Sequence, residues 1–361
     1  MRGTAAADEA WIVDAAFLAD RGAAEQLAAR LEAAGAPARV ERIDDRPPDA
    51  PGDGPQGYLV RTGRFATQAE ADAERARLTA LGFTGLRTVF SAEDGRPATG
   101  PWVVNVLDTS RRRVEAALAI DIVPGRELLS GLAARSGALA SINGGYFVIG
   151  AENGTDGDLA GVSVIGGELL SEAVDGRTSL VLGRHGASVQ AVRDVAGVRT
   201  GGARRELDGF NRVPGLIRGC GGTGDLPTDR PKHDFTCTDP GELIRYTRAF
   251  GATAPAGDGA EALLAPDGRM LELRPARGGA IPPGATVLAG TGDAAAWLRT
   301  HAQLGRRMRT WTALLGERRP LHLVRDRAIV NGGPRLLRGG RADITASAEG
   351  FDWPEDPGFY Y

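Results

Sequence analysis

The sequence is almost without lysine. Of its 43 basic residues only Lys232 is a lysine, so the number of arginines is by itself no sign of phosphate recognition. The formal net charge of −3 lacks the basic excess that is typical of proteins binding nucleic acid. No nucleic-acid partner is therefore predicted.

Long hydrophobic runs are also missing. No stretch approaches the roughly 18 consecutive apolar residues of a membrane-spanning helix, so no membrane span is predicted. Residues 1–10 lack the apolar core of a signal peptide. With 361 residues, 42% hydrophobic and 25% charged, the chain is expected to be globular and long enough for two domains.

Only two cysteines occur, Cys220 and Cys237, in a segment rich in glycine, aspartate and proline. Such a pair predicts a disulfide, and with it an extracellular or cell-envelope location. His233 and Asp234 lie between the two cysteines, which keeps a zinc site open as the weaker alternative. No cofactor is predicted, and a divalent metal stays an open question. An exported chain without a signal peptide suggests that its natural start lies elsewhere.

Residues 9–91 contain one pattern twice. A strand pattern at 11–17, helical spacing over 21–34 and a strand pattern at 38–43 recur at 58–65, 67–81 and 86–90. Thr67 and Glu70 have the spacing of a capping box at the start of the second helix. Two βαβ units predict a ferredoxin-like module with four antiparallel strands, both helices on one sheet face and the other face free.

The second half of this repeat resembles the SPOR domain. The resemblance rests on V-R-T-G-R-F at 60–65, Thr67 with Ala71, and Leu78 with Gly82 and Phe83. The first half departs, since Ala15 stands where the second half has Gly63. The resemblance implies binding to peptidoglycan glycan strands stripped of stem peptides, across the exposed sheet face.

Residues 92–100 are predicted to be a linker, and residues 101–361 a larger, β-rich α+β domain. We expect strands at 102–107 and 115–123, a helix at 128–136, and a meander of strands with glycine turns over 161–182. Residues 197–259 read as a loop-rich insert with one short helix at 240–247. A hairpin at 260–273, a strand at 285–289 and a helix at 293–303 should follow.

The stretch Ala140–Gly150 (A-S-I-N-G-G-Y-F-V-I-G) stands out. Apolar residues on both sides of an Asn-Gly-Gly sequence predict a buried strand, a tight turn and a second strand. A turn held at the lip of a rigid sheet is a common place for ligand binding.

Five carboxylates follow this stretch: Glu152, Asp156, Asp158, Glu172 and Asp175. Hydrolysis at an anomeric carbon needs a general acid and often a second carboxylate. A phosphoryl leaving group gains more from a nearby cation, which Arg177 could supply. Each residue taken singly is more typical of a solvated turn than of a catalytic site.

Four segments resemble the phosphodiester glycosidase family: S-I-N-G-G-Y-F at 141–147, L-A-G at 159–161, R-T-S at 177–179 and N-G-G-P-R-L-L at 331–337. The family includes the enzyme that removes phosphate-linked N-acetylglucosamine to uncover mannose 6-phosphate. The resemblance covers about residues 100–361 and implies cleavage between an anomeric carbon and a phosphate in a sugar-phosphate polymer. Together with the carboxylate argument, it gives a catalytic set of Asn143, Tyr146, Asp158 and Arg177. The implied substrate-binding residues are Gly144, Gly145, Phe147, Gly161, Asn331, Gly332 and Gly333, and no metal ligand is predicted.

One departure from the family bears on activity. Its members continue with an Arg-Thr-Ala-x-Gly strand and a Leu-Asp-Gly-Gly-Gly-Ser loop, and this sequence holds neither motif. The domain is therefore expected to be truncated and to turn over little substrate. Two hypotheses follow: a wall-associated phosphodiester glycosidase, or a non-catalytic peptidoglycan-binding protein with a degenerate glycosidase domain. A nucleic-acid binder built on the ferredoxin-like sheet is disfavoured by the charge.

Overall fold

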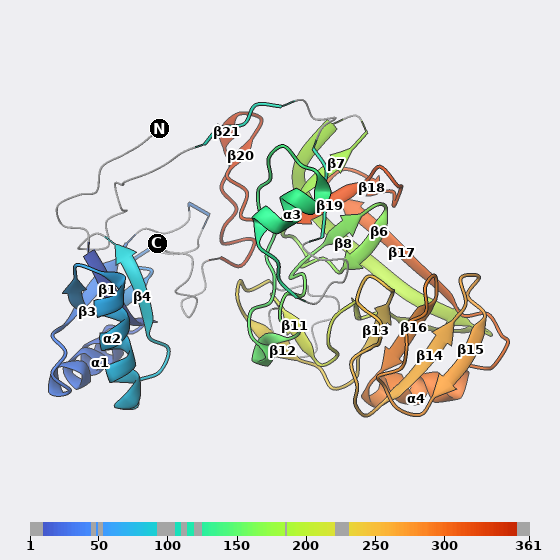
Figure 1. Ribbon diagram of the computed structural model, residues 1–361, viewed down its shortest axis with the longest axis horizontal. Coiled ribbons are helices and arrows are strands. Elements are labelled where there is room, and N and C mark those ends of the chain that lie inside the picture. The colour runs from blue at the N-terminus through green and yellow to red at the C-terminus, as the bar shows by residue number, and fades with distance from the viewer. Residues whose placement is uncertain are drawn as a thin grey trace. The chain divides into compact units, whose positions relative to one another are not determined.

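The computed structural model describes residues 10–44, 48–49, 53–91, 105–109, 114–118, 125–184, 186–220 and 231–351. The chain divides into two compact units, one of residues 1–108 with 344–361 and one of residues 109–343 (Figure 1). Both contain helices and sheets, which confirms the predicted α+β class. The predicted linker 92–100 lies outside the described residues. None of the helices within the described ranges is long and apolar enough to cross a bilayer.

The first unit has the predicted ferredoxin-like order. Its elements are β1 (Ala10–Leu18), α1 (Arg21–Ala33), β2 (Ala38–Ile43), β3 (Gly57–Phe65), α2 (Gln68–Ala80) and β4 (Arg87–Ser91). The strands lie in the order β2-β3-β1-β4, and every pair is antiparallel. Thr67 and Glu70 form the predicted capping box at α2, and the Asp20 side chain caps α1. These local signals are why both helices begin where the sequence indicates.

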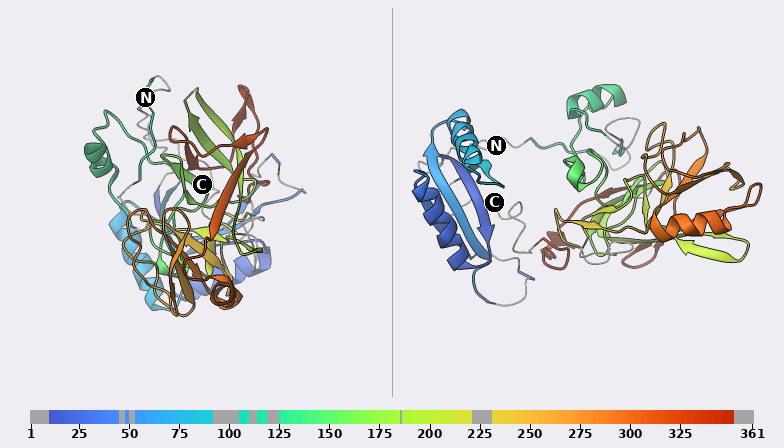
Figure 2. Two further views of the ribbon diagram at one scale, coloured as in Figure 1. Left: turned by 90° about the vertical axis from the view of Figure 1, so that its right-hand side faces the viewer. Right: turned by 90° about the horizontal axis from the view of Figure 1, so that it is seen from below.

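Both helices pack on one face of this sheet (Figure 2). Small and branched residues of the helices meet the sheet there. The buried cluster consists of Ala15, Ala24, Ala28, Leu31, Ala36, Val60, Leu78 and Phe83.

The opposite sheet face is buried, so the prediction of a free face is wrong for its centre. Leu59 and Arg61 flank Val60 and therefore point away from the helices, and both side chains are 0% exposed. Arg61 lies between two carboxylates, with its Nε 2.9 Å from Asp14 and its Nη1 2.9 Å from Glu41. Burial raises the pKa of Asp14, although Arg61 opposes the shift. The sequence pattern missed this because charged residues at alternate positions read as a solvated face.

The second unit contains a large antiparallel sheet. Its main path runs β18-β17-β8-β7-β19-β5-β6, and β9 pairs with β8. The strands are β5 (Ser163–Ile165), β6 (Glu168–Ser171), β7 (Thr178–Gly183), β8 (Gly186–Thr200), β9 (Ala203–Glu206), β17 (Arg309–Gly316), β18 (Pro320–Leu321) and β19 (Ala328–Asn331). The predicted meander forms β5, β6 and β7, with its turns at the expected glycines.

A second sheet of the same unit has the order β10-β13-β16-β14-β15. Its strands are β10 (Gly209–Phe210), β13 (Leu243–Tyr246), β14 (Ala260–Leu264), β15 (Met270–Arg274) and β16 (Thr286–Gly290), and helix α4 (Gly292–His301) packs on β14 and β16. The hairpin, strand and helix predicted over 260–303 are thus confirmed. One buried cluster, with Val164, Val198, Leu288 and Leu298 at its centre, joins residues of both sheets.

Short pieces complete the unit. These are α3 (Leu129–Ser136), the 3-10 turn η3 (Ala151–Asn153), and the two-stranded pairs β11 (Leu216–Arg218) with β12 (Thr236–Thr238) and β20 (Leu337–Arg338) with β21 (Arg341–Ala342). The predicted helix at 128–136 is confirmed by α3.

Three predictions of secondary structure are wrong. The expected helix at 240–247 is strand β13, whose Leu243, Ile244 and Tyr246 are 0% exposed. A short apolar run buried on both faces has no periodicity that separates strand from helix. Residues 197–259 accordingly hold strands of both large sheets rather than an insert of loops. Residues 105–109 and 114–118, the described parts of two expected strands, are not in strands.

The expected hairpin at 138–149 is also absent, since these residues run as an irregular extended segment. Leu139 is 102% and Ile142 86% exposed, while Val148 is 2% exposed. Only Phe147 forms a strand-like bridge there, with Leu159. Tertiary contacts with residues far along the chain, described below, position this segment in place of a local turn.

Replacing Arg61 with methionine should destabilise the first unit by about 3–5 kcal/mol, because two buried carboxylates lose their cation. Hydrogen exchange of β1 and β3 amides in the full chain measures this opening free energy. Arg42→Met is the matched control, since Arg42 and Asp44 form an exposed pair worth about 1 kcal/mol or less. Equal effects of the two substitutions would contradict a stabilising role for the buried network.

Candidate functional site

The side chain of Asn331 joins three segments of the second unit. Asn331 ends β19 and is 5% exposed. Its Oδ1 accepts the backbone N–H of Tyr146. Its Nδ2 lies 3.3 Å from the carbonyl oxygen of Tyr146 and 3.4 Å from that of Gly161. One amide therefore holds together the segments 143–147, 159–161 and 331–333, which the sequence had marked separately.

Two glycines allow this close approach. A Cβ on Gly145 would lie 2.8 Å from Oδ1 of Asn331, and one on Gly161 would lie 3.0 Å from its Cβ. Both glycines also have positive φ, +73° and +131°, which side chains rarely adopt. Larger residues at either position would displace the amide.

Tyr146 extends the junction with its ring. Its hydroxyl donates a hydrogen bond of 2.8 Å to the carbonyl oxygen of Gly333. The ring meets the imidazole of His233 edge to face, with centroids 4.8 Å apart. The other predicted residues of these segments make fewer contacts at the junction. Asn143 is exposed, Gly144 lies against Val330, Phe147 is 43% exposed and Gly332 lies beneath the Thr178 carbonyl.

Two arginines and His233 give the site a cationic side. Arg177 is 4% exposed and follows the turn at 174–176. Burial lowers the pKa of His233 to about 3, and the charges of Arg177 and Arg218 add to this shift. The imidazole is therefore neutral at neutral pH and can act as a hydrogen-bond partner, while the guanidinium groups carry the charge.

Sequence analysis named His233 only together with Asp234, in the zinc alternative, and not as a residue of this site. In the structure the two side chains have different partners, since Asp234 pairs with Arg218 while His233 meets Tyr146. No local pattern places His233 at the site. The available signal was its position within the segment closed by the cysteines.

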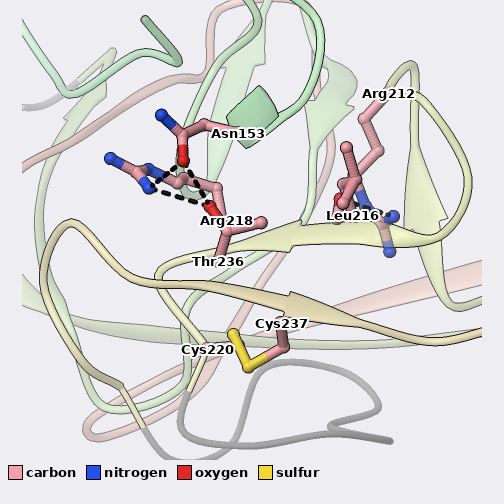
Figure 3. The surroundings of a disulfide bond; sticks show 7 residues. All are labelled: Asn153, Arg212, Leu216, Arg218, Cys220, Thr236 and Cys237. Atoms are coloured by element: carbon pink, nitrogen blue, oxygen red, sulfur yellow. Dashed lines mark hydrogen bonds between the residues drawn. A yellow bond between two sulfur atoms is a disulfide. The ribbon is translucent and has the colours of Figure 1, made fainter. Parts of the chain in front are cut away.

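The predicted disulfide between Cys220 and Cys237 is confirmed, and its Cα atoms are 6.0 Å apart (Figure 3). The two thiols are thus joined and are not zinc ligands. The disulfide lies beside the β11–β12 pair, where Arg218 donates to the Thr236 hydroxyl at 2.8 Å and to the side-chain Oδ1 of Asn153 at 3.2 Å. It thereby closes the chain segment that carries His233 and begins two residues after Arg218.

Arg218 also lines a small hollow, together with Asp158, Glu172 and Arg212. Arg212 is buried and pairs with Glu172 through Nε at 2.5 Å and with Glu242 through Nη1 at 2.9 Å. Burial lowers the pKa of Arg212, but Glu242 and Glu172 outweigh burial and hold it well above its ordinary value. The arginine therefore stays charged and fixes the Glu172 carboxylate.

Asp158 is the carboxyl of this hollow that favours the protonated state. It is 3% exposed, and its Oδ1 accepts the Leu159 N–H at 2.8 Å. Burial raises its pKa well above the ordinary value, and repulsion from Glu172 adds to the shift, against opposing contributions from Arg212 and the Leu159 N–H. A buried, protonated carboxyl is the form that a general acid requires.

The other candidate carboxylates are engaged elsewhere. Asp156 pairs with Arg126 at 3.0 Å, and Asp175 pairs with Arg193 at 2.8 Å. Glu152 lies against Gly150 and accepts weakly from Asn153. Within the described ranges no group of three or more His, Cys, Asp or Glu side chains is placed to hold a metal ion.

Asp194 holds the chain in place directly after Glu172, since its Oδ1 accepts the Ala173 N–H at 2.7 Å. Burial raises its pKa from 3.8 to about 7. Between about pH 4 and 7 the folded chain keeps a proton that the unfolded chain releases, so the free energy of unfolding falls as pH rises through this window. Burial likewise raises the pKa of Asp208 to about 7 and adds a loss of the same sign.

Asp194→Asn keeps the acceptor oxygen and removes this titration. We expect the variant to have a shallower decline of stability over that pH window and to be more stable than the natural chain above it. Urea unfolding at several pH values measures this. Asp267→Asn, at an exposed carboxyl whose pKa is lowered by the Arg269 N–H, is the control and should not gain stability. An unchanged slope in the Asp194 variant would contradict the assignment.

Comparison with known proteins identifies the domain in the first unit and a relative that matches most of the chain. A family model of the SPOR domain matches residues 7–88, a module that binds peptidoglycan. No curated protein matches the chain. The phosphodiester glycosidase family finds no support among these matches.

Three chains of solved structures match, including the two that follow. A presumed exported protein from Burkholderia pseudomallei is 31% identical, with a TM-score of 0.76, over 92% of this chain and 68% of that one. A hypothetical protein from Synechocystis is 17% identical, with a TM-score of 0.45, over 64% of this chain and 38% of that one. The SPOR domain, the exported relative and the disulfide together fit an extracellular or cell-envelope location. With this identity and coverage, the chain belongs to the same family as the Burkholderia protein and begins with a SPOR domain.

Proposed function

We propose that the protein is held to peptidoglycan by its SPOR domain and acts on a sugar-1-phosphodiester with its second unit. The observation that carries the proposal is the junction at Asn331. It brings together the segments that resemble those of phosphodiester glycosidases, and it does so beside two arginines and a protonated carboxyl. A sugar phosphate needs those groups together: cations for the phosphate and an acid for the bond that breaks.

The roles follow from charge and protonation. Arg177 and Arg218 would bind the phosphate oxygens. The neutral imidazole of His233 and the hydroxyl of Tyr146 would orient the ester. Asp158 would protonate the departing oxygen, because burial raises its pKa and favours its protonated form.

A second candidate is a non-catalytic protein that binds the same sugar phosphate. A specific observation favours it. Glu172 lines the same hollow as Asp158 and is the carboxylate that could act as a catalytic base, but Arg212 holds it in a buried ion pair. Asp156 and Asp175 are likewise paired with arginines. An acid without a free second carboxylate would support binding better than hydrolysis.

The two candidates separate in an assay with the methyl phosphodiester of N-acetyl-α-D-glucosamine 1-phosphate. For the enzyme, Asp158→Asn should lower kcat by about a hundredfold or more with little change in KM, because the proton donor is lost. Released N-acetylglucosamine measures turnover, and calorimetry measures binding. Asp175→Asn, at a paired surface carboxylate, is the matched control.

Asn331→Ala should weaken binding in both cases, because the Tyr146 and Gly161 segments lose their shared partner. Binding without turnover in the natural chain would select the non-catalytic candidate. Neither binding nor turnover would overturn the proposal for the second unit.

Peptidoglycan targeting is tested by sedimentation of the full chain with sacculi. We expect more protein in the pellet with amidase-treated sacculi, whose glycan strands lack stem peptides, than with untreated sacculi. Equal sedimentation with both would argue against recognition of bare glycan. This result is independent of turnover, so each half of the proposed function can fail alone.

A further inference from the structure

A second groove lies at the end of β19 remote from Asn331. The β5–β6 turn at Gly166, the β7–β8 turn at Arg184 and the loop that enters β19 at 325–327 surround it. The pairing of Ala328 with Leu182 and of Ile329 with Val164 fixes these turns at one edge of the sheet. Residues 114–116 line a further side.

This groove is separate from the junction at Asn331. Ala328 lines it and Asn331 ends the same strand three residues later, a separation of about 10 Å along an extended chain. It encloses about 890 Å³. Volumes of roughly 300–1,000 Å³ are typical of small-molecule sites, so this groove can take a ligand of several sugar units.

Three arginines, Arg184, Arg325 and Arg327, line the groove. Among the described residues their guanidinium groups make no ion pair and no hydrogen bond, whereas Arg193 and Arg205 of the same unit are paired with Asp175 and Asp293.

Arg327 points most clearly to a missing partner. Its Nε is buried and has no hydrogen-bond partner in the part of the chain that the structure describes. Its guanidinium carbon lies 3.9 Å from where a side chain on Gly183 would begin, so the guanidinium group packs against the end of β7. A buried N–H without an acceptor is unfavourable, and an anionic ligand would supply the acceptor.

Two carboxylates also line the groove, Glu115 and Asp326. Neither is paired with these arginines within the described ranges. Free carboxylates next to free arginines would repel a bare polyanion in part, but they accept hydrogen bonds from hydroxyl groups. Ile165 and Leu182 add apolar surface between the polar groups. This combination matches a sugar chain that carries anionic groups: hydroxyls for the carboxylates, anions for the arginines and ring faces for the apolar side chains.

We propose that this groove binds a segment of an anionic glycan. The proposal goes beyond the function assigned to the Asn331 site and does not require that the second unit hydrolyse anything. Phosphate and carboxylate groups offer the arginines the same oxyanion, so either can be the source of the charge.

The test uses the full chain and fluorescently labelled phosphomannan oligosaccharides, with the same oligosaccharides after removal of phosphate as the neutral probe. The natural chain should bind the phosphorylated probe at least about tenfold more tightly. The variant R184Q/R325Q/R327Q should lose most of that difference. Polygalacturonate oligosaccharides, compared with their methyl esters, show whether carboxylate glycans bind as well.

The matched control is R199Q/R204Q/R309Q. It removes the same charge from exposed arginines on β8, β9 and β17, which also have no ion pair within the described ranges. Unchanged thermal unfolding of both triple variants shows that each is folded. Retention of binding by the control and by Asn331→Ala supports the groove.

Three results would overturn the proposal. These are equal binding of charged and neutral glycans, equal losses in the two triple variants, and no binding of any anionic probe. Loss of turnover with intact glycan binding would concern only the Asn331 site, so the two proposals fail in different ways.

Discussion

The second unit depends on one buried amide. Asn331 lies where β19 ends, and its side chain bonds backbone groups more than 160 residues earlier in the chain. The Tyr146 carbonyl also accepts the Ala160 N–H at 3.0 Å, and a bridge between Phe147 and Leu159 lies beside it. The Asn331 amide adds the link from these two segments to the end of β19. One side chain therefore connects a strand to two segments that pair with each other only briefly.

Each unit also contains one buried arginine held between two acids. Arg61 lies between Asp14 and Glu41, and Arg212 between Glu172 and Glu242. Such networks contribute little net stability relative to apolar residues, but removing one member leaves an unpaired charge. Their effect is on geometry and protonation. In the second unit Glu172, which Arg212 holds in place, raises the pKa of Asp158, while Arg212 itself opposes that shift.

Local signals in the sequence predicted the fold well, and distant contacts limited the rest. The SPOR domain could be predicted element by element because Thr67, Glu70 and the helix-ending glycines act within a few residues. The motif segments of the site were predicted, but their geometry was not. The segment at 138–149 is positioned by hydrogen bonds with the distant Asn331 and not by a local hairpin turn. Arg212 and His233 were missed, since partners 30 and 40 residues away from Arg212 leave no periodic trace. The buried face around Arg61 was missed for the same reason.

The disulfide links the geometry of the site to the compartment in which the protein folds. Cys220 and Cys237 close the segment that carries His233 and lies next to Arg218, so oxidation of the thiols restrains the loop that places His233 against Tyr146. In a reducing cytosol this part of the site would be held by hydrogen bonds such as those from Arg218 to Thr236 and Asn153. An oxidising compartment, which an extracellular or cell-envelope location provides, is where this loop is closed.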